Sequence, residues 1–439
     1  MPTRFRHYDP NQLLMLPPSV KDWLPENHLA YFISDTIDAL DLHQLYARYE
    51  GDGRRSSPYD PAMMLKVLVY GYATGVFSSR RIARKLHEDV AFRVLGAGNF
   101  PAHRTICDFR HDNLSCFRSI FVQVVRLAGA VGLLKLGTVA VDGSKVKANA
   151  SRHKAMSYRR MCAEDARLTE EITQLTERAA RIDAQEDAQY GEEYSGDELP
   201  AEIARRSDRR QVIREAVQRL EERQREKDHG AGRSADDEGR GGKSGGSGKR
   251  SFGEPPAKAQ DNFTDPESRI MKDSRGFEQS YNTQVAVDDE AQIIIATAVT
   301  QDATDVRQLR PVLDTVRRNT GQTPQRVLAD AGYASEENLR SLAARGIDGY
   351  VALGREGKSL RGVGSKPHRC EMARKLQTED GKKQYRRRKW VVEPVFGWIK
   401  SALGFRSFSL RGLGKVTAEW DLVCLALNLR RMSKKMAWE

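Results

Sequence analysis

The sequence predicts an α/β protein in which a mixed β-sheet follows an all-α N-terminal region and is interrupted by an inserted helical hairpin. Three observations predict this architecture. Apolar residues recur at helical spacing within residues 1–134. Strand-like and helix-like segments alternate from residue 281 onward, as in an α/β sheet domain. A highly charged segment, residues 155–228, separates one earlier strand-like stretch from that alternation.

The N-terminal region contains a pair of helices joined by a short turn. A helix is expected to begin at Pro61, after Asp60, and to end at Gly75. Ser78 or Ser79 then caps a second helix whose outer face is basic. This pattern is typical of a helix-turn-helix that contacts DNA, although a plain helical bundle with solvated charges shares it. The basic residues of that face are Arg80, Arg81, Arg84 and Lys85.

The charged segment predicts an antiparallel helical hairpin. Leu168, Ile172 and Leu175 begin a series with alternating spacings of four and three, which indicates a narrow coiled-coil seam. Residues 229–261 are rich in glycine and are expected to form a disordered linker. Dimerisation, DNA clamping and a simple spacer all remain open as the role of the hairpin.

The sheet domain is therefore expected in two pieces on either side of this insertion. They are residues 135–154 and residues 262–425. Residues 426–439 are expected to form a C-terminal tail.

Two expected strands run directly into an aspartate. Residues 138–141 lead to Asp142, and Val327 and Leu328 lead to Asp330. Carboxylates at the ends of core strands are frequent ligand-binding groups, although turn initiation explains a single one. Together with Glu393, in YRRRKWVVEPVFGWIK, they form a candidate set of ligands for two Mg²⁺ or Mn²⁺ ions, which prefer hard oxygen donors. Two such ions about 3.5–4 Å apart support phosphoryl transfer.

Other carboxylates compete for this role. Asp288 lies in an expected hairpin turn, and Asp305 is expected to open a helix, so local structure explains both. Asp302 lies a few residues before that helix and is another competing carboxylate. Asp265 has no such explanation, and we expect it at most to support the site rather than to bind metal.

The composition favours a polyanionic partner. Lys and Arg exceed Asp and Glu by 12, and the pI is about 9.4. Nucleic acid is the commonest such partner, and an ordinary basic enzyme is the alternative. The five cysteines include no CxxC pair, which favours reduced thiols. Neither a signal peptide nor a membrane span is expected, so the expected location is the cytoplasm.

Several stretches closely resemble bacterial insertion-sequence transposases of the DDE superfamily. They are VAVDGSKVKANAS, TDPESRIMKDSRGFEQSYNTQVAVD, VLADAGY and VVEPVFGWIK. The N-terminal SSRRIARKLHEDVAFRVLG and HRTICDFR resemble the InsH-type N-terminal domain of that group. The resemblance implies an RNase H-like core with Asp142, Asp330 and Glu393 as the catalytic, metal-binding triad. It also implies double-stranded DNA partners (transposon ends and target), a homodimer on DNA, and a nucleoid-associated protein of the bacterial cytoplasm.

Related transposases carry a signature of Tyr, two residues, Arg, three residues, Glu, six residues and Lys. Anchored on Glu393, these places hold Arg386, Lys389, Glu393 and Lys400, with a tyrosine one residue before the first place. The resemblance implies that Arg386, Lys389 and Lys400 bind DNA phosphates. Pro394 complicates this register, because a proline either starts a helix there or kinks it.

Two further readings remain open beside catalysis of transposition. One is a transposase-derived protein that binds DNA without catalysis, and the other is a metal-dependent DNA nuclease without strand transfer. Trp390 and Trp398 flank Glu393 and are expected to pack in the core, with stacking on a flipped base as the alternative.

Overall fold

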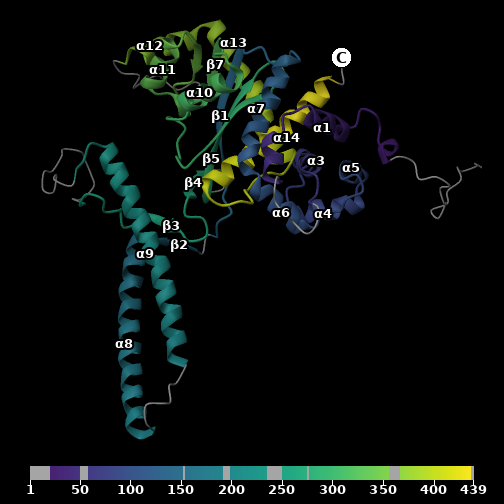
Figure 1. Ribbon diagram of the computed structural model, residues 1–439. Helices are drawn as coiled ribbons and strands as arrows, with labels where there is room; N and C mark the ends of the chain where they lie inside the picture. The colour runs from purple at the N-terminus through teal and green to yellow at the C-terminus, as the bar shows by residue number, and fades with distance from the viewer. Residues whose placement is uncertain are drawn as a thin grey trace, which may run out of the picture.

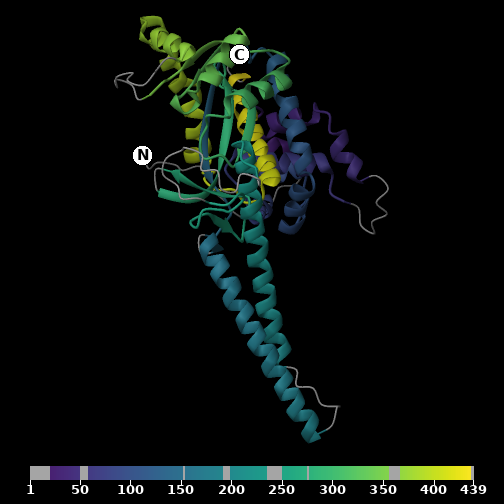
Figure 2. The same cartoon turned by 90° about the vertical axis from the view of Figure 1, so that its left-hand side faces the viewer.

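The fold is described from a computed structural model that covers residues 20–49, 58–151, 154–190, 198–234, 250–273, 276–354 and 366–436. Residues 235–249 of the expected linker lie outside these ranges. A long helical hairpin projects from a body made of a sheet and its surrounding helices (Figures 1 and 2).

The elements follow one another in a helical part, a first strand, the hairpin and a sheet part. The helices are α1 (Leu29–Asp38), α2 (His43–Tyr46), α3 (Pro61–Ala73), α4 (Ser79–Glu88), α5 (Val90–Leu95), α6 (His103–Asp112), α7 (Leu114–Ala130), α8 (Tyr158–Tyr190), α9 (Glu198–Gly230), α10 (Leu309–Thr320), α11 (Glu336–Ala344), α12 (Pro367–Gln377), α13 (Glu379–Gly397) and α14 (Leu413–Met436). The strands are β1 (Thr138–Lys147), β2 (Ala155–Ser157), β3 (Gln260–Asn262), β4 (Arg269–Asp273), β5 (Gly276–Asp288), β6 (Ile294–Thr300), β7 (Arg326–Ala329) and β8 (Asp348–Val351).

The main sheet has the strand order β6-β5-β1-β7-β8. The first three strands pair antiparallel and the last two join in parallel, while β4 pairs with the first half of β5. The central strand β1 is apolar from Val139 to Val141 and is buried there between its two neighbours. The expected mixed sheet is confirmed, and so is the β5-β6 hairpin.

The structure differs from the sequence prediction at the end of β1. The strand does not stop at Val141: it continues through Asp142 to Lys147, paired with β5 throughout. Only its parallel pairing with β7 ends at Val141, opposite Ala329. Asp142 therefore lies where β1 loses one neighbour and keeps the other, and this places its side chain at an opening in the sheet.

Helices cover both the sheet and its outer edge. Helix α13 packs against β1, β7 and β8, whereas α14 and α7 pack against β6. On the free edge of β6, the Asn428 side chain accepts from the Ile294 N–H (2.9 Å) and donates to the Ile294 carbonyl (2.7 Å). These bonds satisfy backbone groups that an uncovered edge strand would leave open.

Residues 426–436 do not form a separate tail, and residues 437–439 lie outside the described ranges. Residues 426–436, expected outside the sheet domain, complete α14, and Ala426, Leu429 and Met432 are buried in the core. Helix α14 also contacts α3, α7 and α1, so the helical N-terminal part and the sheet part share one continuous hydrophobic core.

The N-terminal pair of helices forms as the sequence predicts. Asp60 caps α3 by accepting from the Met63 N–H at 2.8 Å, and Pro61 is its first residue. Helix α4 begins at Ser79, and its apolar side buries Ile82 and Leu86. Ser78 is its N-cap residue, but the Ser78 side chain makes no capping hydrogen bond, so the expected serine cap does not form.

The inserted hairpin is confirmed as α8 and α9. Met161, Leu168 and Ile213 lie in a small hydrophobic cluster between the two helices. Strands β2 and β3 pair at the base of the hairpin, so the insertion leaves and re-enters the body at one place. In the last turn of α9, Asp228 is buried and accepts from the Gly253 N–H at 3.0 Å, which joins the end of this helix to the later part of the glycine-rich segment.

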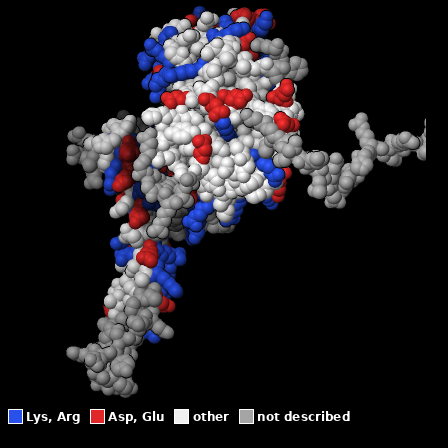
Figure 3. Space-filling model, turned by 45° about the vertical axis from the view of Figure 1, so that its right-hand side comes forward, with Lys and Arg blue, Asp and Glu red and all other residues white. Residues whose placement is uncertain are grey.

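Charge is distributed unevenly over the surface. Figure 3 shows Lys and Arg gathered at the upper end of the molecule, a band of acidic side chains beneath them, and both signs mixed along the projecting hairpin. Among the described helices, none combines the length and the apolar character that a membrane crossing requires.

Candidate active site

Asp142 is a mostly buried carboxylate in the middle of β1. Its side chain is 17% exposed and accepts from the Gly143 N–H at 2.8 Å and from Arg388 Nη1 at 2.9 Å. Burial raises the pKa of Asp142 to about 6; Arg388 opposes this rise, and the nearby Asp330 adds to it. The site therefore holds negative charge at a cost that a bound cation would reduce.

Asp330 stands at the end of β7, next to the opening. Its carboxylate caps the short 3₁₀ turn Ala331–Tyr333 by accepting from the Gly332 N–H at 2.8 Å. Asp142 and Asp330 are close enough for the charge of one to raise the pKa of the other. The structure thus brings together Asp142 and Asp330, the two carboxylates predicted from the strand ends. The turn after Asp330, which was the alternative explanation for that residue, is also present.

Glycines leave room for these carboxylates. A Cβ atom on Gly143 would lie 2.3 Å from Gln284 Nε2 and 2.7 Å from Asp305 Oδ1. A Cβ atom on Gly332 would lie 2.9 Å from Asp330 Oδ1. The small residues that follow both aspartates in sequence therefore reflect close approach of polar side chains.

Asp305 belongs to the same site, which the sequence reading did not predict. It was expected to open a helix, but α10 begins at Leu309 with Gln308 as its N-cap residue. The Asp305 carboxylate instead accepts from Asn282 Nδ2 (2.6 Å) and Gln284 Nε2 (2.7 Å), and Lys145 Nζ lies 3.4 Å away. Its negative charge also raises the pKa of Asp142.

Helix α13 runs through Pro394 without a break and continues into a π-helical turn, Trp398–Ala402. Proline has no N–H to donate to the carbonyl four residues earlier. That carbonyl, of Trp390, instead accepts from Gln292 Nε2 at 2.6 Å. A partner from the β5-β6 turn thus replaces the missing helical bond, and the residues on both sides of Glu393 share one helix.

Glu393 lies on the outer side of α13 and is 54% exposed. Its Oε1 atom is 3.7 Å from Nη2 of Arg388, the same guanidinium group that binds Asp142. Glu393 and Asp142 are therefore linked through one arginine rather than in direct contact. Within the described ranges, no three His, Cys, Asp or Glu side chains are grouped closely enough to hold a metal ion.

Arg388 is the basic residue of α13 that reaches into the site. Burial opposes its charge, but Asp142, Tyr385 and Asp330 more than offset this, so the pKa of its guanidinium is raised. Tyr385 and Arg388 keep the signature's spacing of two intervening residues, one position earlier than the register anchored on Glu393. That offset was visible in the sequence as the tyrosine one residue out of place.

The basic residues named from the signature lie in two settings. Arg386 and Lys389 are exposed, and Arg386 lines an outer hollow of about 500 Å³ together with Trp390. Lys400 donates to Ser144 Oγ at 2.6 Å and to the Lys145 carbonyl at 2.9 Å, close to Asp142 in β1. Lys400 is thus joined to the strand that carries Asp142, whereas Arg386 and Lys389 face solvent.

The other acidic residues named from the sequence have local roles. Buried Asp265 accepts from the Tyr281 hydroxyl at 2.9 Å and from the Gly412 N–H at 3.2 Å, which fixes the loop before α14. Asp288 accepts from the Leu136 N–H at 2.8 Å, next to the β5-β6 turn in which it was expected. Asp302 is exposed.

The two tryptophans beside Glu393 differ in exposure. Trp390 is 77% exposed, so the expectation that it packs in the core is wrong. It follows Lys389 on the outer side of α13, and the buried side of the helix is formed by Val391, Val392 and Val395. Trp398 is half-buried against α14.

The basic face of α4 is open to solvent. Arg80, Arg81 and Arg84 are exposed and Lys85 is partly exposed. Arg84 lies 3.6 Å from Glu88, and Lys85 lies 3.6 Å from Asp89. Such exposed pairs are weak and leave the side chains available to other anions.

Comparison with known protein families gives two matches. Residues 254–429 match the family described as a transposase DDE domain, and residues 18–112 match the transposase domain DUF772. Asp330 and Glu393 lie within the first match, whereas Asp142 lies between the two. Comparison with curated proteins and with solved structures finds no significant match.

The sheet order, the carboxylates at its opening and the matched DDE domain define an α/β protein with an RNase H-like transposase core. Both matched families are transposase families, and their presence in one chain supports an insertion-sequence DDE transposase.

Proposed function

We propose that the protein cuts DNA at the ends of its insertion sequence and joins those ends to target DNA, with Asp142, Asp330 and Glu393 as its catalytic carboxylates. In the cutting step, a water oxygen bonds to the scissile phosphorus and the bond to the 3′ oxygen breaks, which leaves a 3′-hydroxyl and a 5′-phosphate. In the joining step, that 3′-hydroxyl attacks a target phosphodiester and displaces its 3′ oxygen.

The observation that carries the proposal is the juxtaposition of Asp142 and Asp330 where the parallel pairing of β1 and β7 ends. A buried carboxylate whose pKa is raised further by a second carboxylate beside it costs free energy in the metal-free fold. A protein that keeps such a pair without using it would gain stability by losing one member. Such arrangements are typical of functional sites.

The chemistry of the donors suits two Mg²⁺ or Mn²⁺ ions held by Asp142, Asp330 and Glu393. All three offer carboxylate oxygens, the donors these ions prefer, and burial, with smaller contributions from Asp330 and Asp305, raises the pKa of Asp142, so a bound cation would relieve the cost of keeping it ionised. When bound, the ions activate the attacking oxygen and stabilise the leaving one. Arg388 balances part of that charge in the metal-free protein through Asp142 and Glu393.

Basic side chains around these carboxylates position the DNA. Lys400, held against β1 by Ser144, would contact a phosphate close to the scissile bond. Arg386 and Lys389 would contact phosphates farther along the outer side of α13. Phosphate contacts of this kind fix the register of the duplex and make binding depend on salt.

The basic face of α4 is the proposed contact with the duplex at the N-terminal part. Arg80, Arg81, Arg84 and Lys85 present positive charge from one helix that follows another after a short turn. Because a transposition reaction acts on two ends, we propose that two copies of the chain assemble on DNA.

A cleavage and strand-transfer assay tests this function directly. The purified protein is incubated with its own end sequences and Mg²⁺, and products are resolved for nicks, 3′-hydroxyl ends and joined target. We expect both products, and their loss in Glu393→Ala. Activity that survives this substitution contradicts the assignment of Glu393. Cleavage without joining indicates a nuclease, and binding without cleavage indicates a DNA-binding protein that has lost catalysis.

A further inference from the structure

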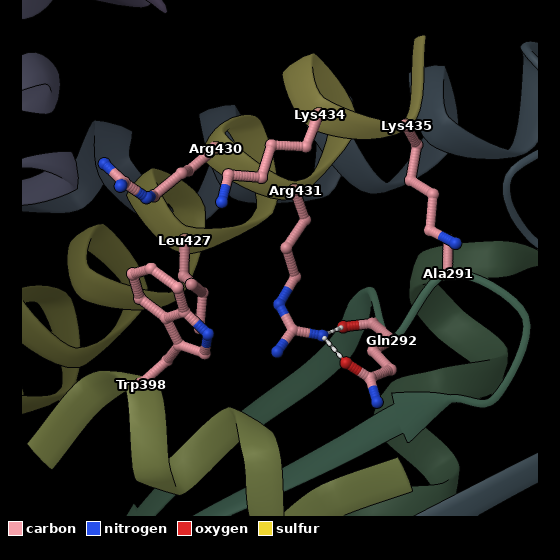
Figure 4. A pocket seen from close by; sticks show the side chains of 8 residues that line it. All are labelled: Ala291, Gln292, Trp398, Leu427, Arg430, Arg431, Lys434 and Lys435. Atoms are coloured by element: carbon pink, nitrogen blue, oxygen red, sulfur yellow. Dashed lines mark hydrogen bonds between the residues drawn. The ribbon is translucent and has the colours of Figure 1, made fainter. Parts of the chain in front are cut away.

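A basic pocket lies beside the β5-β6 turn, outside the carboxylate site. It is formed by the last turns of α14, by Gln292 in that turn and by Trp398 in the π-helical turn after α13 (Figure 4). Its volume is about 180 Å³. An engineered cavity of about 150 Å³ already accommodates benzene, so the pocket has room for a phosphate group.

The lining carries four positive charges and, among its described residues, no carboxylate. The charges belong to Arg430, Arg431, Lys434 and Lys435. The acid next to the pocket in sequence, Glu290, forms an ion pair at 2.8 Å with Lys135 on another segment. A concave surface of one charge sign concentrates ions of the opposite sign.

Helix electrostatics explain only part of this arrangement. Lys434 and Lys435 are exposed in the last turn of α14, where cations interact favourably with the helix dipole. Arg430 and Arg431 lie a turn earlier and are partly buried. Burial lowers the pKa of Arg431 to about 10, which still leaves the guanidinium charged at neutral pH.

Arg431 is held rigidly by neutral acceptors. Its Nη1 atom donates to both the carbonyl and Oε1 of Gln292, each at 2.7 Å. Gln292 has a φ of 56°, a strained value for a residue with a side chain. Figure 4 shows the other terminal nitrogen of Arg431 without a hydrogen bond to the residues drawn.

The indole ring of Trp398 holds two of the cations in place. Arg430 Cζ lies 5.0 Å and Lys434 Nζ lies 5.3 Å from the ring centroid, which is the range of cation–π contacts. The buried Nε atom of Arg430 has no hydrogen-bond partner in the described part of the chain. The guanidinium of Arg430 also donates from Nη1 to the Ala73 carbonyl at 3.1 Å, so Arg430 is fixed by the body of the protein as well as by Trp398.

We propose that this pocket binds a backbone phosphate of the DNA, outside the carboxylate site. This inference rests on the proposed function and adds a second anchor for the same DNA. Two guanidinium and two ammonium groups suit the tetrahedral, negatively charged oxygens of a phosphate, and they exclude a metal ion. Trp398 lies five residues after Glu393, and Gln292 bonds both to Arg431 and to the Trp390 carbonyl, so a phosphate bound here lies along the same helix as the catalytic carboxylate.

The test uses a variant that keeps the fold intact. Lys434→Gln/Lys435→Gln removes two exposed charges, and surface substitutions of this kind change stability by about 0.5 kcal/mol or less. The matched control is Lys227→Gln/Lys258→Gln, which removes two exposed lysines at the base of the projecting hairpin. Both variants and the parent are titrated with an end-sequence DNA duplex at several salt concentrations.

We expect the pocket variant to bind more weakly and to reduce the slope of log affinity against log salt by about 1, the effect of one lost phosphate contact. The control should keep the parent slope. The proposal is overturned if the pocket variant and the parent have equal salt slopes. It is also overturned if the pocket variant and the control variant lose DNA affinity equally.

Trp398 gives an independent readout. DNA should change the tryptophan emission of the parent more than that of Trp398→Phe. The part of the emission change that comes from Trp398 should be smaller when Lys434→Gln and Lys435→Gln are also present. If ATP, but not DNA, produces a Trp398 signal that depends on Lys434 and Lys435, the site belongs to a free nucleotide and the DNA assignment is overturned. If the pocket variant has a smaller salt slope than the parent but the parent cleaves no DNA, the proposed catalysis is contradicted and the phosphate pocket is supported. If the parent cleaves DNA but the pocket variant and the parent have the same salt slope, the phosphate pocket is contradicted and the proposed catalysis is supported.

Discussion

Asp142→Asn should stabilise the metal-free protein at pH 8 while abolishing cleavage. Asparagine resembles the protonated carboxyl group, so the substitution removes the cost of keeping Asp142 ionised in the fold. That cost follows from the rise of the pKa from its ordinary value of 3.8 to about 6, which amounts to about 3 kcal/mol. The effect of Arg388 is already included, because it lowers the same pKa.

The pH dependence gives the sign of the effect. The folded state holds the Asp142 proton more tightly than the unfolded chain, so this group makes the parent lose stability as the pH rises from about 4 to 6. The extra unfolding free energy of Asp142→Asn relative to the parent should therefore be near zero at pH 4, increase through pH 6 and level off at higher pH.

Thermal unfolding in EDTA measures this advantage. At about 2–4 °C per kcal/mol for a domain of 150–250 residues, 3 kcal/mol corresponds to a Tm increase of about 6–12 °C at pH 8. Added Mg²⁺ should raise the Tm of the parent by binding the folded state, but not that of the variant. Asp302→Asn, which neutralises an exposed aspartate, serves as the control and should show neither effect.

Two results would refute this reasoning. One is a variant that melts at or below the parent at pH 8, which would mean that Asp142 is stabilised by its partners rather than strained by burial. The other is a Tm difference that does not change between pH 4 and pH 8.

Three further substitutions test other parts of the structure. Gly143→Ala would place a Cβ atom 2.3 Å from Gln284 Nε2, so either β1 or the buried side chain of Gln284 must shift; we expect a loss of about 1–3 kcal/mol in unfolding free energy and a larger proportional loss of cleavage rate. Asn428→Leu leaves the N–H and carbonyl of Ile294 unpaired and should cost at least about 2 kcal/mol by denaturant titration; a neutral result would show that α14 does not cover that edge. Trp390→Ala should leave stability within about 0.5 kcal/mol, because the ring is 77% exposed, but weaken binding to a DNA end with unpaired bases by about 1–3 kcal/mol; unchanged affinity would exclude stacking.

Local signals in the sequence were enough where the interacting groups are neighbours in the chain. The start of α3 at Pro61, directly after Asp60, was predicted correctly, and Asp60 caps the helix by accepting from the Met63 N–H at 2.8 Å. That cap joins a side chain and an N–H only three residues apart, so it does not depend on a distant segment.

The same local reasoning misplaced Asp305 and Trp390. A helix cap seemed sufficient for Asp305, but the amide groups of Asn282 and Gln284, on a strand more than twenty residues earlier, bind it instead. Trp390 looked like a core residue by type, yet the valines that follow it take the buried side of α13.

The sequence by itself determined the order of helices and strands, the hairpin insertion and the candidacy of Asp142, Asp330 and Glu393, because hydrophobic periodicity and strand ends are local properties. The tertiary structure alone decided which groups meet them: Arg388 between Asp142 and Glu393, and Asp305 beside Gly143. It also decided that α13 passes through Pro394, since the carbonyl that proline leaves without a donor is satisfied by Gln292, about one hundred residues earlier in the chain. Contacts between residues so distant in sequence depend on how the sheet and its helices pack, and no local pattern specifies them.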